Sequence, residues 1–213
     1  MTSGMSGDKL QSASRDDSRR RGKSLEEAIL ASTWAELTES GYSSLTLEAV
    51  ARRSGTSRPV LHRRWKSRAD LVAAALIRHF ALHPVDVPDL ANLRDELALL
   101  LRQLADRSTP MVVQIILAMS EDLAREGRNI AVLRSRIVDD GPMNAIIQRG
   151  IGRGEIDSCK LTPHIASLPQ DLLRHQAIMT NDGISDDFIF IVLDQIFLPL
   201  VSRADQGEPP AIP

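Results

Sequence analysis

The residues best suited to chemistry lie between Thr46 and Asp70, in a stretch that reads TLEAVARRSGTSRPVLHRRWKSRAD. Its second half is rich in arginine and also carries serine, histidine and lysine. Charged and polar side chains of this kind form hydrogen bonds with the edges of bases and with phosphate oxygens. The stretch therefore predicts a surface that binds nucleic acid.

Two short helices are expected to position these side chains. The first begins at Thr46, whose hydroxyl group can cap it, and runs to a tight turn at Gly55. The second begins after Ser57, and Pro59 is tolerated because it falls in the first turn. This arrangement is a helix-turn-helix, in which one helix crosses the phosphate backbone and the other enters the major groove. Three apolar residues are spaced to pack the second helix onto its neighbours: Val60, Leu61 and Trp65.

The rest of the chain also shows helical periodicity, and no strand pattern competes with it. A helix is predicted from Ser24, which forms a capping box with Glu27, to a stop at Gly41, and another begins at Ser67. Pro142 and Pro169 fall inside later helices and are expected to kink them. The five later helices are predicted at 89–107, 110–126, 129–150, 162–180 and 186–203. The fold class is therefore all-α, with about nine helices.

The two ends of the chain differ in their balance of basic and acidic residues. Residues 1–79 carry 14 Lys and Arg against 9 Asp and Glu, whereas the remaining residues carry 12 against 19. Such a split suggests that the first part faces a polyanion. No long apolar run and no signal peptide are evident, so we expect a cytoplasmic protein that does not enter a membrane. The single cysteine, Cys159, favours neither a disulfide nor a zinc site.

Four segments follow from these patterns. Residues 1–23 are polar and basic and are expected to form a disordered basic arm, which either follows the DNA or only aids solubility. Residues 24–68 form the helix-turn-helix DNA-binding domain, and residues 69–205 form a C-terminal helical domain. Residues 206–213, rich in proline, are expected to be disordered.

From about Ile29 to Val72 the sequence resembles the TetR/AcrR family of transcription regulators. The run ILASTWAELTESGY is similar to that family's first helix and following turn, and TLEAVARRSGTSRPVLHRRWKSRADLV to its helix-turn-helix and the start of its fourth helix. The resemblance implies a ligand-responsive homodimer, a repressor released from a palindromic operator in double-stranded DNA by a small-molecule effector. One departure is His62, because the family commonly places tyrosine there, so we expect a weaker or pH-dependent phosphate contact.

The resemblance also implies roles for individual residues. Thr46 would bind a phosphate at its helix start, although its alternative role is capping alone. Arg52 and Arg53 are better interpreted as a solvated helix face. The residues expected nearest the bases are Ser57, Arg58 and Pro59. Those expected mainly to hold the DNA backbone are His62, Arg63, Lys66 and Arg68, the last standing where the family usually has lysine.

The C-terminal domain carries the expectations about ligand and partner. Its last two helices, at 164–180 and 186–202, are more apolar than one small core needs. This excess favours a homodimer that forms through these helices. The alternative is that the two helices only complete the core of one subunit. Polar residues and methionines in apolar helical surroundings are candidates for an effector pocket, and the alternative for each is an ordinary core or hydrogen-bonded position. These candidates are Met111, Gln114, Met143, Asn144, Gln148, His175 and Met179.

The sequence also bears on two alternative functions. An enzyme would need a nucleophile beside a base, paired carboxylates or a metal cluster, and no such motif occurs, so we expect no catalytic residue, no metal and no cofactor. The second alternative keeps DNA binding, but its C-terminal domain only dimerises or binds a protein partner, with no small-molecule effector. The sequence does not decide between this reading and an effector-binding domain.

Overall fold

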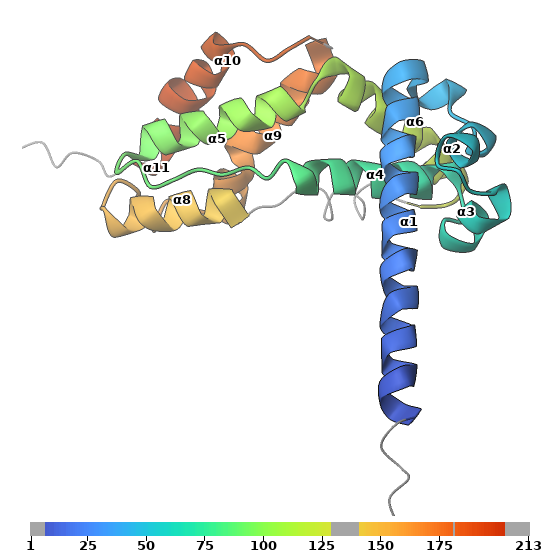
Figure 1. Cartoon of the computed structure of the whole chain (residues 1–213). Helices are drawn as coiled ribbons and strands as arrows, with labels where there is room; N and C mark the ends of the chain where they lie inside the picture. Colours follow the sequence, from blue (N-terminus) through green and yellow to red (C-terminus); the bar gives the residue numbers. More distant parts are fainter. Residues whose placement is uncertain (1–6, 129–140, 181, 203–213) are drawn as a thin grey trace, which may run out of the picture. The chain divides into compact units, whose positions relative to one another are not determined.

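The computed structural model describes residues 7–128, 141–180 and 182–202, and every regular element within them is a helix (Figure 1). The predicted all-α fold with its N-terminal helix-turn-helix is therefore confirmed. The first six helices are α1 (Gly7–Ser44), α2 (Leu47–Arg53), α3 (Arg58–Arg64), α4 (Arg68–Leu82), α5 (Leu93–Arg107) and α6 (Pro110–Arg125). They are followed by α8 (Gly141–Gly152), α9 (Pro163–Thr180), α10 (Asp186–Phe190), the π-helix η1 (Ile191–Phe197) and α11 (Leu198–Val201).

The chain forms two compact units. The first comprises Met1–His83 and Ile115–Ile137, and the second comprises Pro84–Gln114 and Val138–Pro213. Helix α4 therefore belongs to the unit that carries the helix-turn-helix, whereas the sequence suggested a division after residue 68. The chain passes from the second unit into the first within α6, between Gln114 and Ile115.

Helix α1 begins earlier than the sequence indicates. It starts at Gly7, so residues 7–23 continue the helix where a disordered arm was expected, and Ser24 lies inside the helix instead of capping it. Extending an existing helix costs far less than nucleating one, and no proline interrupts this segment. Gly41 breaks the helical geometry near the other end, with φ at 73° and ψ at 172°.

The helix ends around the turn follow their local signals. Thr46 caps α2 by accepting a hydrogen bond from the amide of Ala49 at 3.1 Å, and Ser67 caps α4 by accepting from Asp70 at 3.2 Å. Gly55 takes a φ of 64°, which glycine adopts without strain. Ser57 takes the capping position of α3 but makes no capping hydrogen bond through its side chain. These local features fix the path of the chain from α2 into α3.

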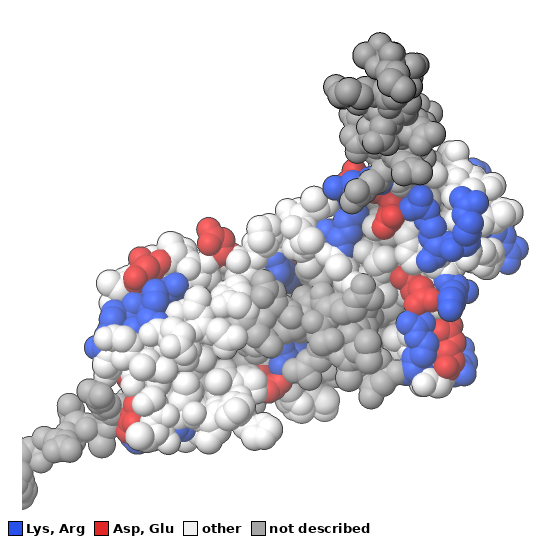
Figure 2. Space-filling view, turned by 90° about the horizontal axis from the view of Figure 1, so that it is seen from below, with Lys and Arg blue, Asp and Glu red and all other residues white. Residues whose placement is uncertain are grey.

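The core of the first unit lies mainly between α1 and α4. Buried side chains of α1, such as Ile29 and Leu37, belong to this core together with Leu71 and Leu76 of α4. Trp34 stacks on His79, with ring centroids 3.7 Å apart. In Figure 2, several Lys and Arg side chains lie on the part of this unit that carries α2 and α3, with Asp and Glu side chains among them.

Helix α5 lies at the centre of the second unit and packs against α8, α9 and α10. Its buried face includes Leu97 and Leu101, which share one apolar cluster with Ile146 of α8 and Phe197 of η1. Arg94 of α5 also binds both carboxylate oxygens of Asp194, at 2.7 Å each. The segment η1 is thus fastened to α5 by apolar packing and by an ion pair.

Two expectations about proline can be compared with the structure. Pro142 falls in the first turn of α8, because that helix begins at Gly141, so it opens a helix instead of kinking one. Helix α9 continues through Pro169, which is buried. The first part of the helix predicted at 129–150 and the tail predicted at 206–213 lie outside the described residues.

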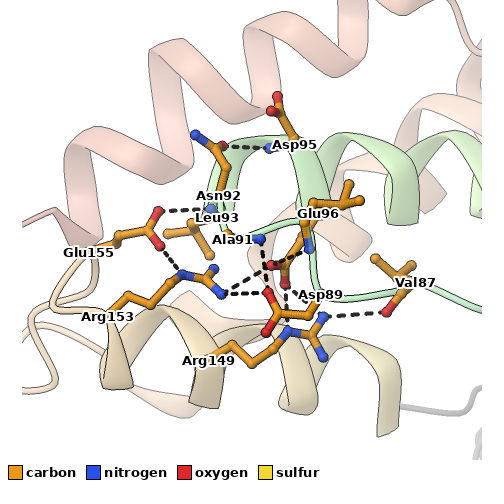
Figure 3. Close-up of polar contacts among 11 residues, drawn as sticks. Val87, Asp89, Ala91, Asn92, Leu93, Asp95, Glu96, Arg149, Arg153 and Glu155 are labelled. Atoms are coloured by element: carbon orange, nitrogen blue, oxygen red, sulfur yellow. Dashed lines mark hydrogen bonds and ion pairs between the residues drawn. The ribbon is translucent and has the colours of Figure 1, made fainter.

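A charged cluster holds the segment that joins α4 to α5 (Figure 3). The fully buried carboxylate of Glu96 binds Arg149 at 2.6 Å and Arg153 at 3.1 Å, and it accepts a hydrogen bond from the amide of Leu90 at 3.2 Å. Arg153 also binds Asp89 at 3.1 Å. A buried carboxylate is stable only when it is paired in this way. The cluster therefore fixes the segment that follows α4 to the second unit.

Candidate DNA-binding surface

Helix α3 has one buried and one exposed side. Leu61 is fully buried, and Trp65 at the end of the helix is 9% exposed, so this side packs into the first unit. Burying an apolar side chain of this size stabilises the fold by about 1.5–3 kcal/mol. The remaining positions of α3 face outward, apart from the half-buried Val60. The packing of Leu61 and Trp65 thus determines which side chains of α3 meet the solvent.

Most of the predicted DNA contacts share this exposed surface. Seven of the eight are exposed: Thr46, Ser57, Arg58, Pro59, His62, Arg63 and Lys66. They come from the capping position of α2, from α3 and from the turn that follows it. Among the described residues, Arg63 and Lys66 make no ion pair, so their charges are available to an anion. Figure 2 shows Lys and Arg side chains on the part of the first unit that carries α2 and α3.

Two arginines of the helix-turn-helix are instead bound to α1. Arg53 donates to Glu36 at 2.7 Å and also binds Glu39, so this exposed side chain also ties α2 to α1. Arg64 binds Glu26 at 2.7 Å and the carbonyl oxygen of Gly22 at 3.2 Å. These contacts hold α2 and α3 in place against α1.

Arg68, the eighth predicted contact, is half-buried. Its guanidinium binds the carboxylate of Asp122 at 2.6 Å and lies 4.4 Å from the centre of the Tyr42 ring. The Tyr42 hydroxyl donates to the same carboxylate at 2.7 Å. A second ion pair, between Asp70 and Arg128 at 2.7 Å, lies near the same two segments of chain. Arg68 therefore ties α4 to α6, and its phosphate contact stays a prediction.

The contacts around Asp122 shift the pKa values of the groups involved. The hydrogen bonds from Arg68 and Tyr42 lower the pKa of the Asp122 carboxyl, because both stabilise its charged form. Burial and the hydrogen bond to Asp122 raise the pKa of the Tyr42 hydroxyl. Sequence analysis missed Asp122, since it stands 54 residues from Arg68 and no local pattern marks the pair.

The predicted effector residues all lie in the second unit, but they do not share one environment. Met143 is buried in the apolar cluster of α5 and α8, and Met111 is half-buried. The other five are exposed: Gln114, Asn144, Gln148, His175 and Met179. An exposed side chain does not line an enclosed cavity of a single chain, so the structure does not bring these residues together as a pocket. Their role stays a prediction.

The described residues also bear on two other kinds of site. Within the described ranges, no three His, Cys, Asp or Glu side chains are grouped so that they could hold a metal ion. None of the described helices is both long enough and apolar enough to cross a membrane.

Two protein-family models match this chain. Residues 29–81 match the model of the bacterial regulatory proteins of the tetR family, and residues 87–196 match that of the tetracyclin repressor-like C-terminal domain. The chain therefore belongs to the tetR family, which confirms the resemblance seen in the sequence. It is a DNA-binding transcription regulator with a helix-turn-helix, and its family is not one of enzymes.

Curated relatives and solved structures agree with this assignment. The chain is 32% identical over 182 residues to an HTH-type transcriptional regulator of Mycobacterium tuberculosis, covering 84% of this chain and 89% of the relative. It is 30% identical over 188 residues to the DNA-binding transcriptional repressor TetR of Mycobacteroides abscessus, covering 85% and 96%.

Two crystal structures share the fold. A TetR-family regulator of Mesorhizobium loti matches with a TM-score of 0.60 at 14% identity, covering 86% of this chain and 99% of the other. A TetR regulator of Agrobacterium tumefaciens matches with a TM-score of 0.59 at 20% identity, covering 84% and 94%. At these identities the likeness concerns the fold alone.

The first prediction concerns Asp122. Asp122→Asn should lower the free energy of unfolding at pH 7 by about 1.5–3 kcal/mol, because Arg68 loses a charged partner. The folded-state pKa of Asp122 is lowered, so its contribution is complete above its usual pKa near 4 and is lost as the pH falls through the lowered value. The difference between variant and parent should therefore shrink below about pH 4. Urea unfolding at pH 7, 5 and 3.5 measures it, and an equal difference at all three pH values would contradict the ion pair.

Proposed function

We propose that this regulator is a homodimeric repressor whose two α3 helices bind a palindromic operator and whose second unit binds a small-molecule effector that releases the DNA. The observation that carries the proposal is the two-sided α3. Its buried side fixes the helix, and its exposed side presents arginine, histidine and serine to an incoming duplex. A helix held in this manner can enter the major groove with its first turn against the bases.

The exposed residues divide into two roles. The exposed capping end of α2 at Thr46 suits a phosphate oxygen, because free amides at a helix start attract anions. Residues in the first turn of α3 lie nearest the bases, and those further along hold the backbone. The base-facing residues are Ser57, Arg58 and Pro59, and the backbone-facing residues are His62, Arg63 and Lys66. Arg68 is assigned mainly to holding α6, with a phosphate contact as its second role.

Exposed apolar side chains support a dimer through the last helices. Large apolar residues on α9 to α11 remain exposed in the single chain: Ile178, Met179, Phe190, Ile191 and Leu200. A group of this kind favours a partner surface, and a two-fold axis would let the same residues meet their copies. A dimer of this type would set its two α3 helices about 34–36 Å apart, one turn of DNA.

Effector release has a physical route along the chain. Helix α6 begins in the second unit and ends in the first, where Asp122 holds both Arg68 of α4 and Tyr42. If an effector displaced the start of α6, the ion pair would carry that displacement to α4. The bound effector would then favour a state that binds DNA poorly, and its differential affinity for the two states would set the extent of release. The Mycobacteroides abscessus relative, itself described as a repressor, supports the proposed direction of control.

The second prediction concerns salt dependence. Arg63→Ala should weaken binding to specific and non-specific duplexes alike and should lower the slope of log Kobs against log salt concentration by about 1. Arg52→Ala is the matched control, because Arg52 is an exposed arginine on α2 that the proposal leaves in solvent. Fluorescence anisotropy across a range of salt concentrations measures both. An unchanged slope for Arg63→Ala would remove this residue from the interface.

The third prediction concerns the dimer. Phe190, 49% exposed, should be buried by the second subunit, so Phe190→Asp should raise the dimer dissociation constant at least about tenfold. Leu117→Asp is the control, since Leu117 is 46% exposed but belongs to α6. Sedimentation equilibrium of the three proteins gives the constants. Equal constants for parent and Phe190→Asp would place the dimer interface elsewhere.

The fourth prediction concerns the effector. A compound that releases the operator by binding the second unit must raise the Tm of the DNA-free chain, by an amount that grows with the logarithm of its excess over Kd. Thermal unfolding and gel retardation with the same compounds test this. Release without any rise in Tm would contradict an effector site on the protein. Release by a protein that binds the second unit would favour the alternative, a C-terminal domain without a small-molecule effector.

A further inference from the structure

The first residue of the recognition helix is held by two neighbours. Arg58 Nη1 lies 2.5 Å from the carboxylate of Glu48, in the first turn of α2, and Arg58 Nε donates to His62 Nε2 at 3.2 Å. Within the described part of the chain, Arg58 Nη2 contacts no acceptor. The guanidinium is therefore fixed at two of its nitrogens and is free to donate from the third.

A carboxylate is unexpected on this surface. Glu48 is two residues from Thr46, where a phosphate is proposed to bind, and its side chain is 56% exposed. A negative charge at that place repels the DNA backbone and lowers affinity for every sequence. An ion pair in which both partners are 56% exposed also contributes little to stability. An acidic residue in the first turn of α2 favours the start of that helix, but this role needs no contact with Arg58.

We infer that Glu48 is a positioning residue that directs Arg58 to a base edge and away from the phosphates, so that it sets sequence specificity. This inference rests on the proposed function, in which Arg58 faces the bases. A free arginine samples many rotamers and binds phosphates well, whereas one held at two nitrogens loses less entropy when it meets a base. Swinging to a phosphate would break the pair and leave Glu48 uncompensated beside the backbone.

The chemistry of the free donors indicates the base. A guanidinium recognises guanine through the N7 and O6 acceptors in the major groove. The remaining hydrogens of Arg58 are donors only, so they match the two acceptors of guanine, meet an unfavourable amino donor on adenine or cytosine, and find a single acceptor, O4, on thymine. Glu48 therefore favours a guanine at the position that Arg58 reads.

The test uses the full-length protein and duplexes selected by it from a randomised pool. Glu48→Gln removes the charge but keeps the shape, and it should raise affinity for a scrambled duplex while lowering the ratio of specific to scrambled affinity about five- to tenfold. Glu121→Gln is the matched control, because Glu121 is an exposed glutamate that also pairs with an arginine, Arg125, but lies on α6 outside the helix-turn-helix. It should leave the ratio unchanged. The Tm of Glu48→Gln should stay within about 2 °C of the parent.

A double-mutant cycle separates positioning from any independent effect of Glu48. In the Arg58→Ala background, Glu48→Gln should no longer change which base is preferred at the position that Arg58 reads. If the two substitutions act additively on that preference, or if Glu48→Gln leaves the affinity ratio at the parent value, the inference is overturned while the proposed DNA contact stands. If Arg58→Ala itself leaves all base preferences intact, Arg58 does not read a base, and both the proposed contact and the inference fail.

Discussion

The burial of Leu61 and Trp65 is the interaction on which the DNA-binding surface depends. These side chains fix the rotation of a helix only seven residues long, which would not be stable alone. Once that rotation is fixed, Arg58, His62 and Arg63 have to face solvent, because they occupy the other side of the helix. Ion pairs from Arg53 and Arg64 to α1 then hold the pair of helices to the rest of the unit.

The charges of the first unit have two distinct uses. Several of its arginines have carboxylate partners and serve packing, as Arg53, Arg64 and Arg68 do. Arg63 and Lys66 make no ion pair among the described residues, so their charges are available to an anion. Arg58 combines both uses, since a carboxylate holds it while part of its guanidinium remains available. A simple count of basic residues therefore overstates the number that face DNA, and the partner of each arginine decides its role.

The structure could be predicted from the sequence where a signal acts between residues that are close together in the chain. Thr46, Gly55 and Ser67 act on residues within one turn, so the helix-turn-helix and its boundaries were predictable from local patterns. The start of α1 was not, because a helix already formed can extend past a residue such as Ser24 that is also suited to cap it. Arg68 and Asp122 are far apart in the chain, and their pairing exists only in the folded unit. The effector candidates depended on which side of a helix is buried, and only Met143 proved to be buried.

The most direct test of the account asks whether the exposed side of α3 touches DNA. A photo-crosslinking amino acid placed at His62, which is exposed on α3, is compared with the same group placed at the exposed Ala145 on α8. Irradiation with a duplex selected by the parent protein should give a covalent protein–DNA adduct from position 62 and none from position 145. An adduct from position 145 alone, or equal yields from both, would contradict the assignment of α3 as the DNA-reading helix.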